Sequence, residues 1–315
     1  MKFLSLLAAL LLEQVRPLRD GNPLYSAFER YAAWLERQLN AGQYYHGVLA
    51  WCLAVLPLVI VTVGVYHLLD AVSPILAWAW NITILYLTMG FRQFSHYFRE
   101  IARALREADI ATAREYLARW RGVSAAELTP AEIARVSIEL ALAGSHRHVF
   151  GPIAWFLLLG PAGAITYRLS AMLAQAWRKP DETADEKAGG AEADEFGLPA
   201  QRFFFAYDWL PARLTAASFA VVGNFEDAVY CWRTQAPAWS ASAQSILLAS
   251  GGGAMGVRLG DALHREGGGV ELRPELGLGD EADVDYMQSA IGLIWRALVL
   301  WMFLVFVVTV AHSLG

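Results

Sequence analysis

Long runs of apolar residues, more than any alternation of apolar and polar positions, dominate this chain. Three runs are long enough for a helix to cross the hydrocarbon core of a bilayer, which takes about 20 residues. They cover residues 47–69, 71–91 and 297–314. Shorter or interrupted runs, which we expect to be membrane segments too, cover residues 3–15, 149–173 and 209–225. The pattern predicts an all-α, polytopic helical membrane protein, with residues 1–315 forming one membrane domain.

The run at residues 149–173 contains two breaks, Gly151-Pro152 and Gly160-Pro161. Two structures fit these breaks: a kinked helix that spans the membrane once, or a re-entrant hairpin that continues to about Trp177. Membrane helices tolerate such breaks where neighbouring groups satisfy the freed backbone. We favour the kinked span.

Charge sets the orientation of these segments. Residues 92–148 hold nine arginines, whereas the connection at Asp70 between the first two long runs holds none. Because cytoplasmic loops of membrane proteins are enriched in Lys and Arg, we place residues 92–148 in the cytoplasm and Asp70 outside. The amino-terminal segment is expected to be retained, since no small-residue cleavage site follows it.

Residues 92–148 show helical rather than strand periodicity. Apolar residues recur at helical spacing with arginines on the other faces, which predicts an amphipathic helix beside the membrane; they are Phe94, Phe98, Ile101 and Leu105. Asp109 is expected to cap a second helix. Thr129-Pro130-Ala131-Glu132 is a capping box that starts a third helix, which runs through Glu139.

Two other segments are expected to lie outside the membrane. Residues 179–198 are acidic and rich in small residues, which predicts a flexible loop. Residues 226–290 form a glycine-rich extramembrane segment.

Composition agrees with a lipid environment. The chain is 56% hydrophobic and 17% charged, against about 25% charged in soluble domains. We therefore expect the lipid bilayer as a partner. The net charge of −5 gives no basis for nucleic acid binding, which needs clustered Lys and Arg. The cysteines Cys52 and Cys231 indicate free thiols.

Two motifs suggest ligands but have simpler explanations. The glycines of SGGGAMG (250–256) fit the dinucleotide fingerprint G-x-G-x-x-G, with SILLA (245–249) as a short strand before them. A dinucleotide-binding domain needs several strand and helix units around this turn, and the segment lacks them, so we predict no Rossmann domain. His146 and His148 point about 200° apart on a helix, so no metal site is predicted.

Four charged residues are candidate ligand-binding groups. Arg213 lies beside an apolar run with Asp208 nearby, and charged groups at membrane depth normally face a protein interior or a cavity. Alternatively, Arg213 reaches the lipid headgroups. Glu139 is either a site acid or a solvated surface charge. Arg258 directly follows the glycine run.

Several motifs in order resemble the CobD/CbiB family, the adenosylcobinamide-phosphate synthases of cobalamin biosynthesis. They are Ala113-Arg114, Ile138-Glu139, the run from Pro152, LPARLTA (210–216) and GGGAMGVRLGDAL (251–263), the last similar to the family's A-G-A-L-G-V-R-L-G-G. This resemblance implies an ATP-dependent synthase that forms an amide between adenosylcobyric acid and aminopropanol or its phosphate, with Mg²⁺ and a corrinoid ligand.

Three polar motifs of the synthases are replaced in this chain. R-D-T corresponds to Val123-Ser124-Ala125, E-N-x-x-D to AGSHRH (143–148), and S-P-N to Ala241-Ser242-Ala243. LLLEQ (10–14) and DWLPARL (208–214) resemble AmpE, an inner-membrane protein associated with β-lactamase induction. We therefore expect a diverged, AmpE-like member with a regulatory or accessory role and an eroded synthase site; the alternative is an active synthase. The resemblance also implies a bacterial-type inner (cytoplasmic) membrane, crossed several times.

Overall fold

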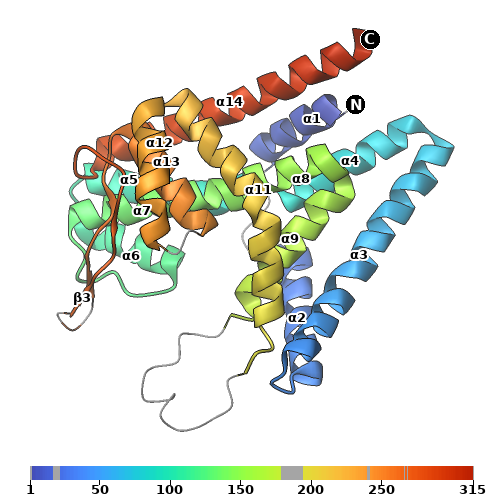
Figure 1. Ribbon diagram of the computed structural model, residues 1–315, viewed down its shortest axis with the longest axis horizontal. Helices are drawn as coiled ribbons and strands as arrows, with labels where there is room; N and C mark the ends of the chain where they lie inside the picture. Colours follow the sequence, from blue (N-terminus) through green and yellow to red (C-terminus); the bar gives the residue numbers. More distant parts are fainter. Residues whose placement is uncertain are drawn as a thin grey trace. The chain divides into compact units, whose positions relative to one another are not determined.

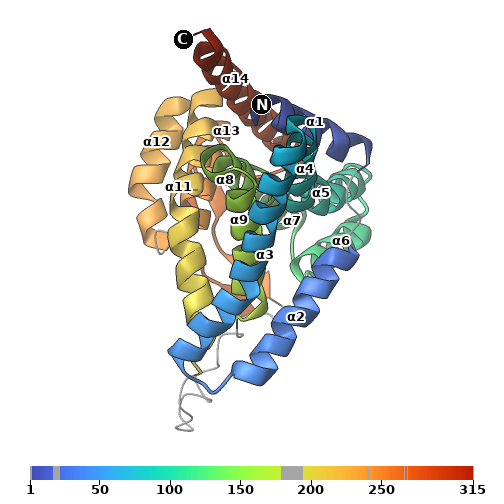
Figure 2. The same ribbon diagram turned by 90° about the vertical axis from the view of Figure 1, so that its right-hand side faces the viewer.

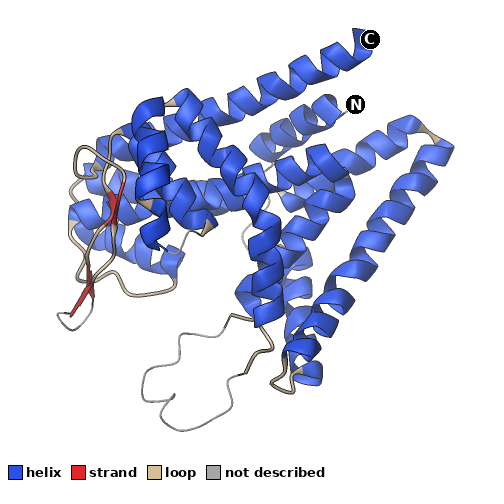
Figure 3. Cartoon of the chain, viewed as in Figure 1, coloured by secondary structure: helices blue, strands red, loops and turns tan. Residues whose placement is uncertain are grey.

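The computed structural model describes residues 2–16, 22–178, 194–239, 242–265, 267 and 269–314. Nearly all of this part of the chain is helical (Figure 3), which confirms the all-α prediction. The expected loop at 179–198 falls mostly outside it, as does Ala241. The chain divides into two compact units, Met1–Met89 with Gly151–Trp209, and Gly90–Phe150 with Leu210–Gly315. We describe each unit by itself.

The first unit is a helical bundle. It contains α1 (Lys2–Val15), α2 (Pro23–Leu39), α3 (Tyr44–Val72), α4 (Pro74–Thr88), α8 (Gly151–Leu159), α9 (Pro161–Ala176) and the beginning of α11 (Leu198–Val222). The helices α3 and α4 form a hairpin (Figure 1), in which the Ser73 side chain accepts a hydrogen bond from the Ile75 N–H and Pro74 opens α4. Alongside α3 lies α2 (Figure 2), and their shared core includes Phe28, Leu35 and Ala54.

The expected break at Gly160-Pro161 is present. Gly160 has φ +68°, a conformation that favours glycine, and it separates α8 from α9, which pack against each other. The Gly151-Pro152 pair also starts a helix, directly after a π-helical turn over His146–Phe150. That residues 149–173 cross a bilayer stays a prediction.

The second unit surrounds a central buried helix, α7 (Pro130–Ser145). This helix packs against α5 (Phe91–Arg106), α6 (Ile110–Arg121), α13 (Ala243–Met255) and α14 (Val284–Leu314), and α12 (Phe225–Thr234) lies against α13. Four short strands form two antiparallel pairs, β1 (Leu259–Gly260) with β4 (Glu275–Leu276) and β2 (Leu263–Arg265) with β3 (Gly269–Glu271). In the described part of the chain these two strand pairs are too small to form the sheet of a dinucleotide-binding domain.

The predicted helix starts in this unit are confirmed. The Asp109 side chain accepts a hydrogen bond from the Thr112 N–H and caps α6. Thr129 and Glu132 form the expected reciprocal capping box of α7. On α5, Phe98 and Ile101 are buried while Arg99 and Arg103 are exposed, as the amphipathic pattern predicted.

Two helices among the described residues are long and apolar enough to cross a membrane, Tyr44–Val72 and Val284–His312. Only 22% and 28% of their most apolar windows are buried inside the protein. Exposed apolar side chains such as Ile60 and Val308 therefore cover these helices, which favours contact with lipid because soluble proteins rarely expose large apolar patches. That these two helices and the other four predicted segments cross a membrane stays a prediction.

The glycine run adopts a different structure from the one its motif suggested. Residues 245–249 are not a strand; they belong to α13, which continues through Gly251, Gly252 and Gly253 to Met255 and ends at Gly256 in the left-handed conformation. The glycines serve close packing between helices. A Cβ atom at Gly253 would lie 2.5 Å from the Asp227 carbonyl oxygen of α12.

Replacing Gly253 by alanine should therefore destabilise the protein by about 1–3 kcal/mol, because the added methyl group meets backbone that cannot move aside. At Gly292, on α14 of the same unit, an added methyl group would meet no atom within 4 Å. Gly292→Ala should be neutral or stabilise by up to about 1 kcal/mol through helix propensity. Unfolding of both purified variants in detergent measures the difference; equal stabilities would contradict this account of the glycine run.

Candidate functional site

Three charged side chains line one face of the buried helix α7. Glu132, Arg135 and Glu139 stand at positions i, i+3 and i+7, a spacing that places them in one row along a helix. They are only 6%, 6% and 4% exposed. Charged groups are almost never this buried unless they are paired, and each of the three is bound by the segment from Gly260 to Arg273. We call these three residues and their partners the α7 clamp.

The strongest contact of the α7 clamp joins Glu139 to Arg273. The Arg273 guanidinium donates to both carboxylate oxygens, at 2.9 Å to Oε2 and 3.2 Å to Oε1. The Gly260 N–H also donates to Oε1, at 2.8 Å. Because a two-pronged Arg–carboxylate pair is among the stronger charge-assisted contacts, this carboxylate is fully engaged by the protein. Glu139 is therefore not a solvated surface charge, and a role in ligand binding stays a prediction.

Arg273 also fixes the backbone beside Glu139. Its guanidinium donates to the Gly260 carbonyl at 2.8 Å and to the Asp261 carbonyl at 3.0 Å. The guanidinium carbon lies 5.6 Å from the centre of the Trp239 ring, a cation–π arrangement. One side chain thus ties α7 to the loop that follows the Val257-Arg258-Leu259-Gly260 run.

Arg135 holds the next part of the same loop. Its guanidinium donates to Asp261 Oδ2 at 3.1 Å and to the Ala262 carbonyl. Asp261 has φ +61°, a conformation that costs little for glycine and more for other residues. At this position the run A-G-A-L-G-V-R-L-G-G has its last glycine. The contact with Arg135 offsets that cost.

Glu132 completes the α7 clamp at the start of the helix. Its carboxylate accepts hydrogen bonds from the Thr129 N–H at 2.7 Å and from the His264 N–H at 3.0 Å, and Oε1 lies 2.9 Å from His264 Nδ1. Burial alone would raise the pKa of Glu132, but these hydrogen bonds outweigh it and lower the pKa to about 2. Glu132 is therefore ionised at neutral pH.

Glycine conformations bring the loop to α7. Gly260 has φ +71°, and a Cβ atom there would lie 2.2 Å from the Pro274 carbonyl oxygen. This close approach allows Leu259–Gly260 to pair with Glu275–Leu276. The pairing places Arg273, which lies just before β4, against Glu139.

Arg258 differs from the arginines of the α7 clamp. Its side chain is exposed, and within the described residues its guanidinium has no hydrogen bond or ion pair. Its backbone N–H donates to the Asp280 carbonyl at 2.8 Å, so the position of the residue is fixed while its charge stays available to a ligand.

The structure places the other candidates elsewhere. Asp208 is 5% exposed in the first unit, and its Oδ1 accepts a hydrogen bond from the Tyr167 hydroxyl at 2.7 Å. Arg213 is half-buried on α11, in the part that belongs to the second unit. His146 Nδ1 lies 3.0 Å from the Thr215 hydroxyl. The described residues contain no group of three His, Cys, Asp or Glu side chains that could hold a metal ion.

Sequence reasoning did not identify Arg135, Asp261 or Arg273. Arg135 carried a usable signal, because it lies between Glu132 and Glu139 on the face of a helix that is otherwise apolar. Arg273 carried none: it follows Leu272 and precedes Pro274 in an irregular segment, 134 residues from its partner Glu139.

Comparison with known proteins identifies related chains. A family model described as CobD/Cbib protein matches residues 6–294. The chain is 34% identical over 306 residues to the cobalamin biosynthesis protein CobD of Stutzerimonas stutzeri (strain A1501), covering 95% of each chain. It is 34% identical over 252 residues to CobD of Chromobacterium violaceum, covering 80% of this chain and 72% of the relative. It is 26% identical over 249 residues to the cobalamin biosynthesis protein CbiB of Salmonella typhimurium (strain LT2), covering 74% and 72%. No solved structure matches significantly.

Proposed function

We propose a function from one premise: this chain belongs to the CobD/Cbib protein family. We infer that it acts in cobalamin biosynthesis as an amide-forming synthase, which joins aminopropanol or its phosphate to adenosylcobyric acid with ATP. We place it in the inner membrane with the α7 clamp on the cytoplasmic side, where the nucleotide is available.

The observation that carries this proposal is the similarity to CobD along 95% of both chains. The family model also matches residues 6–294, a range that includes the three replaced motifs. The α7 clamp supports the same conclusion, since its charges are paired with the loop that follows Val257-Arg258-Leu259-Gly260, the run that resembles the synthases. Each of its three charged side chains has an oppositely charged partner, while the buried Arg135 Nε has no hydrogen bond within the described residues. We therefore prefer the synthase to the regulatory, AmpE-like alternative.

The proposed reaction makes one bond and needs one leaving group. The carboxylate takes a phosphoryl group from ATP, which leaves as ADP. The amine nitrogen then forms a C–N bond with the carboxyl carbon and loses a proton, while the C–O bond to the phosphorylated oxygen breaks and phosphate leaves. Transfer of a phosphoryl group needs cations that stabilise its negative charge. Arg258 suits this role because its guanidinium is exposed and its backbone is anchored. Glu132 and Glu139 are already engaged by the protein, so we assign no step to Mg²⁺.

Complementation tests the proposal. A strain that lacks its own cobinamide-phosphate synthase, grown where cobalamin is required, should grow when it carries this gene. Arg258→Ala should lower the rate of the step on the order of 100-fold, as loss of one charge-stabilising donor does, and growth should fail. Arg119→Ala is the matched control, since Arg119 is an exposed arginine of the same unit, on α6.

Immunoblots of membrane fractions should show equal amounts of the wild-type protein and both variants. Absence of growth with wild-type protein present at normal amounts would reject the synthase. A change in β-lactamase induction on deleting the gene, together with that absence, would favour the AmpE-like role.

A further inference from the structure

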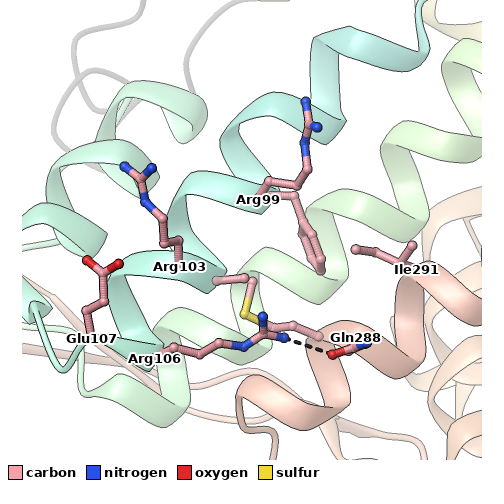
Figure 4. Close-up of a pocket in the computed structure, with 9 residues that line it drawn as sticks. Arg99, Arg103, Arg106, Glu107, Gln288 and Ile291 are labelled. Carbon is pink, nitrogen blue, oxygen red and sulfur yellow. Dashed lines mark hydrogen bonds between the residues drawn. The ribbon is translucent and has the colours of Figure 1, made fainter. Parts of the chain in front are cut away.

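A pocket of about 520 Å³ lies between α5 and α14 in the second unit, apart from the α7 clamp. Figure 4 shows its two sides: arginines project from α5, and Gln288 and Ile291 approach from α14. Arg106 reaches across and donates to Gln288 Oε1 at 2.9 Å. The pocket joins a charged rim to an apolar floor.

The rim of the pocket is positively charged. Arg99, Arg103 and Arg106 stand at positions i, i+4 and i+7 of α5 and line the pocket, against one carboxylate, Glu107. Arg106 bonds to a neutral amide and so keeps its full charge. Arg103 pairs with Glu100 at 2.9 Å, but its side chain is 66% exposed, and exposed pairs contribute about 0–1 kcal/mol. An anion can therefore compete for these guanidinium groups.

The floor of the pocket is apolar. It consists of Phe98, which is 2% exposed, Met287, which is fully buried, and the partly covered side chains Ala102 and Ile291. A small inorganic anion alone would leave the apolar side chains of the floor in contact with water. A charged rim above an apolar floor fits a ligand that carries both an anionic group and an apolar portion.

The place of the pocket along α14 indicates where such a ligand comes from. Gln288 and Ile291 precede the apolar stretch that starts at Ala297 by roughly 9–14 Å, given the 1.5 Å rise of a helix. If Ala297 marks the edge of the hydrocarbon core, the pocket stands at the depth of the lipid headgroups on the arginine-rich side of the protein. Juxtamembrane arginines at this depth attract anionic lipid.

We propose that the α5–α14 pocket binds a phosphate group, with the phosphate of an anionic phospholipid as its expected source and a soluble phosphate ester as the other. Guanidinium groups match phosphate oxygens in charge and geometry. This site is separate from the synthase reaction, and its test does not depend on that reaction.

The test uses the full-length protein in detergent and measures lipid retention by native mass spectrometry. The probes are phosphatidylglycerol, phosphatidylcholine and inorganic phosphate. Wild-type protein should retain phosphatidylglycerol in preference to phosphatidylcholine. Arg99→Gln combined with Arg106→Gln should weaken phosphatidylglycerol binding about tenfold, which corresponds to about 1.4 kcal/mol.

The matched control is Arg119→Gln combined with Arg233→Gln, which removes the same charge from exposed positions on α6 and α12 of the same unit. Ile291→Glu, which adds a carboxylate to the pocket, is a second variant.

If inorganic phosphate displaces the bound lipid from wild type at low concentration, the site takes soluble phosphate; if it does not, the site takes lipid. Thermal unfolding should show that all of these variants are folded. If both pocket variants then bind phosphatidylglycerol as tightly as the control pair does, the proposal is wrong.

Discussion

Glu139→Gln should lower the free energy of unfolding by about 3 kcal/mol. Removing one member of a buried ion pair costs about 3–5 kcal/mol, because the remaining charge loses its partner without regaining water. The lower end applies here, since the Arg273 side chain is 15% exposed and retains some solvent. Arg273→Gln should cost at least as much, because it leaves the more deeply buried carboxylate of Glu139 unpaired.

A double-mutant cycle separates pairing from other effects. Glu139→Gln combined with Arg273→Gln should cost less than the sum of the two single changes by about 0.5–3 kcal/mol, the range seen for residues in direct contact. The control is the pair Glu115 and Arg119, which is closer at 2.6 Å but 61% and 62% exposed. Its removal should cost under about 1 kcal/mol. Denaturant unfolding in detergent supplies all values, and equal costs at the two pairs would contradict the role given to burial.

The sequence predicted the parts of this structure that depend on neighbours along the chain. Asp109 and Thr129 were identified as helix starts because a cap joins residues three positions apart. The amphipathic helix α5 followed from its periodicity. Glu139 was a candidate because it ends the predicted helix capped by Thr129, a few residues before an apolar segment, with a solvated surface charge as the alternative.

The contacts that depend on folding could not be predicted in this way. Glu139 binds Arg273, and nothing between the two residues specifies that a strand pair at Gly260 will bring them together. The glycine run shows how a local motif can mislead. It fits a nucleotide-binding fingerprint, which the lack of surrounding strand and helix units excluded, and Gly253 is a glycine because the α12 backbone lies against it. Local patterns identify elements, and packing decides how these elements use their residues.

Acid should remove the contribution of Glu132 to stability. The pKa of Glu132 is lowered from 4.5 to about 2 in the folded protein, so folding favours the ionised form. The stabilisation is fully present above pH 4.5 and is lost as pH falls from 4.5 through about 2, because the unfolded chain binds the proton more tightly. A shift of this size corresponds to about 3 kcal/mol.

Glu132→Gln should therefore destabilise the protein at pH 6 and flatten its stability between pH 4.5 and 2, since the amide cannot ionise. The flattening distinguishes a contribution of the ionised carboxylate and its hydrogen bonds from a loss of packing alone, which would lower stability equally at every pH. Glu115→Gln, at an exposed acid on α6, is the control for removing a carboxylate. Unfolding free energies measured across this pH range test both variants. A parallel downward shift in Glu132→Gln would mean that the side chain stabilises the fold through packing and not through its ionised form.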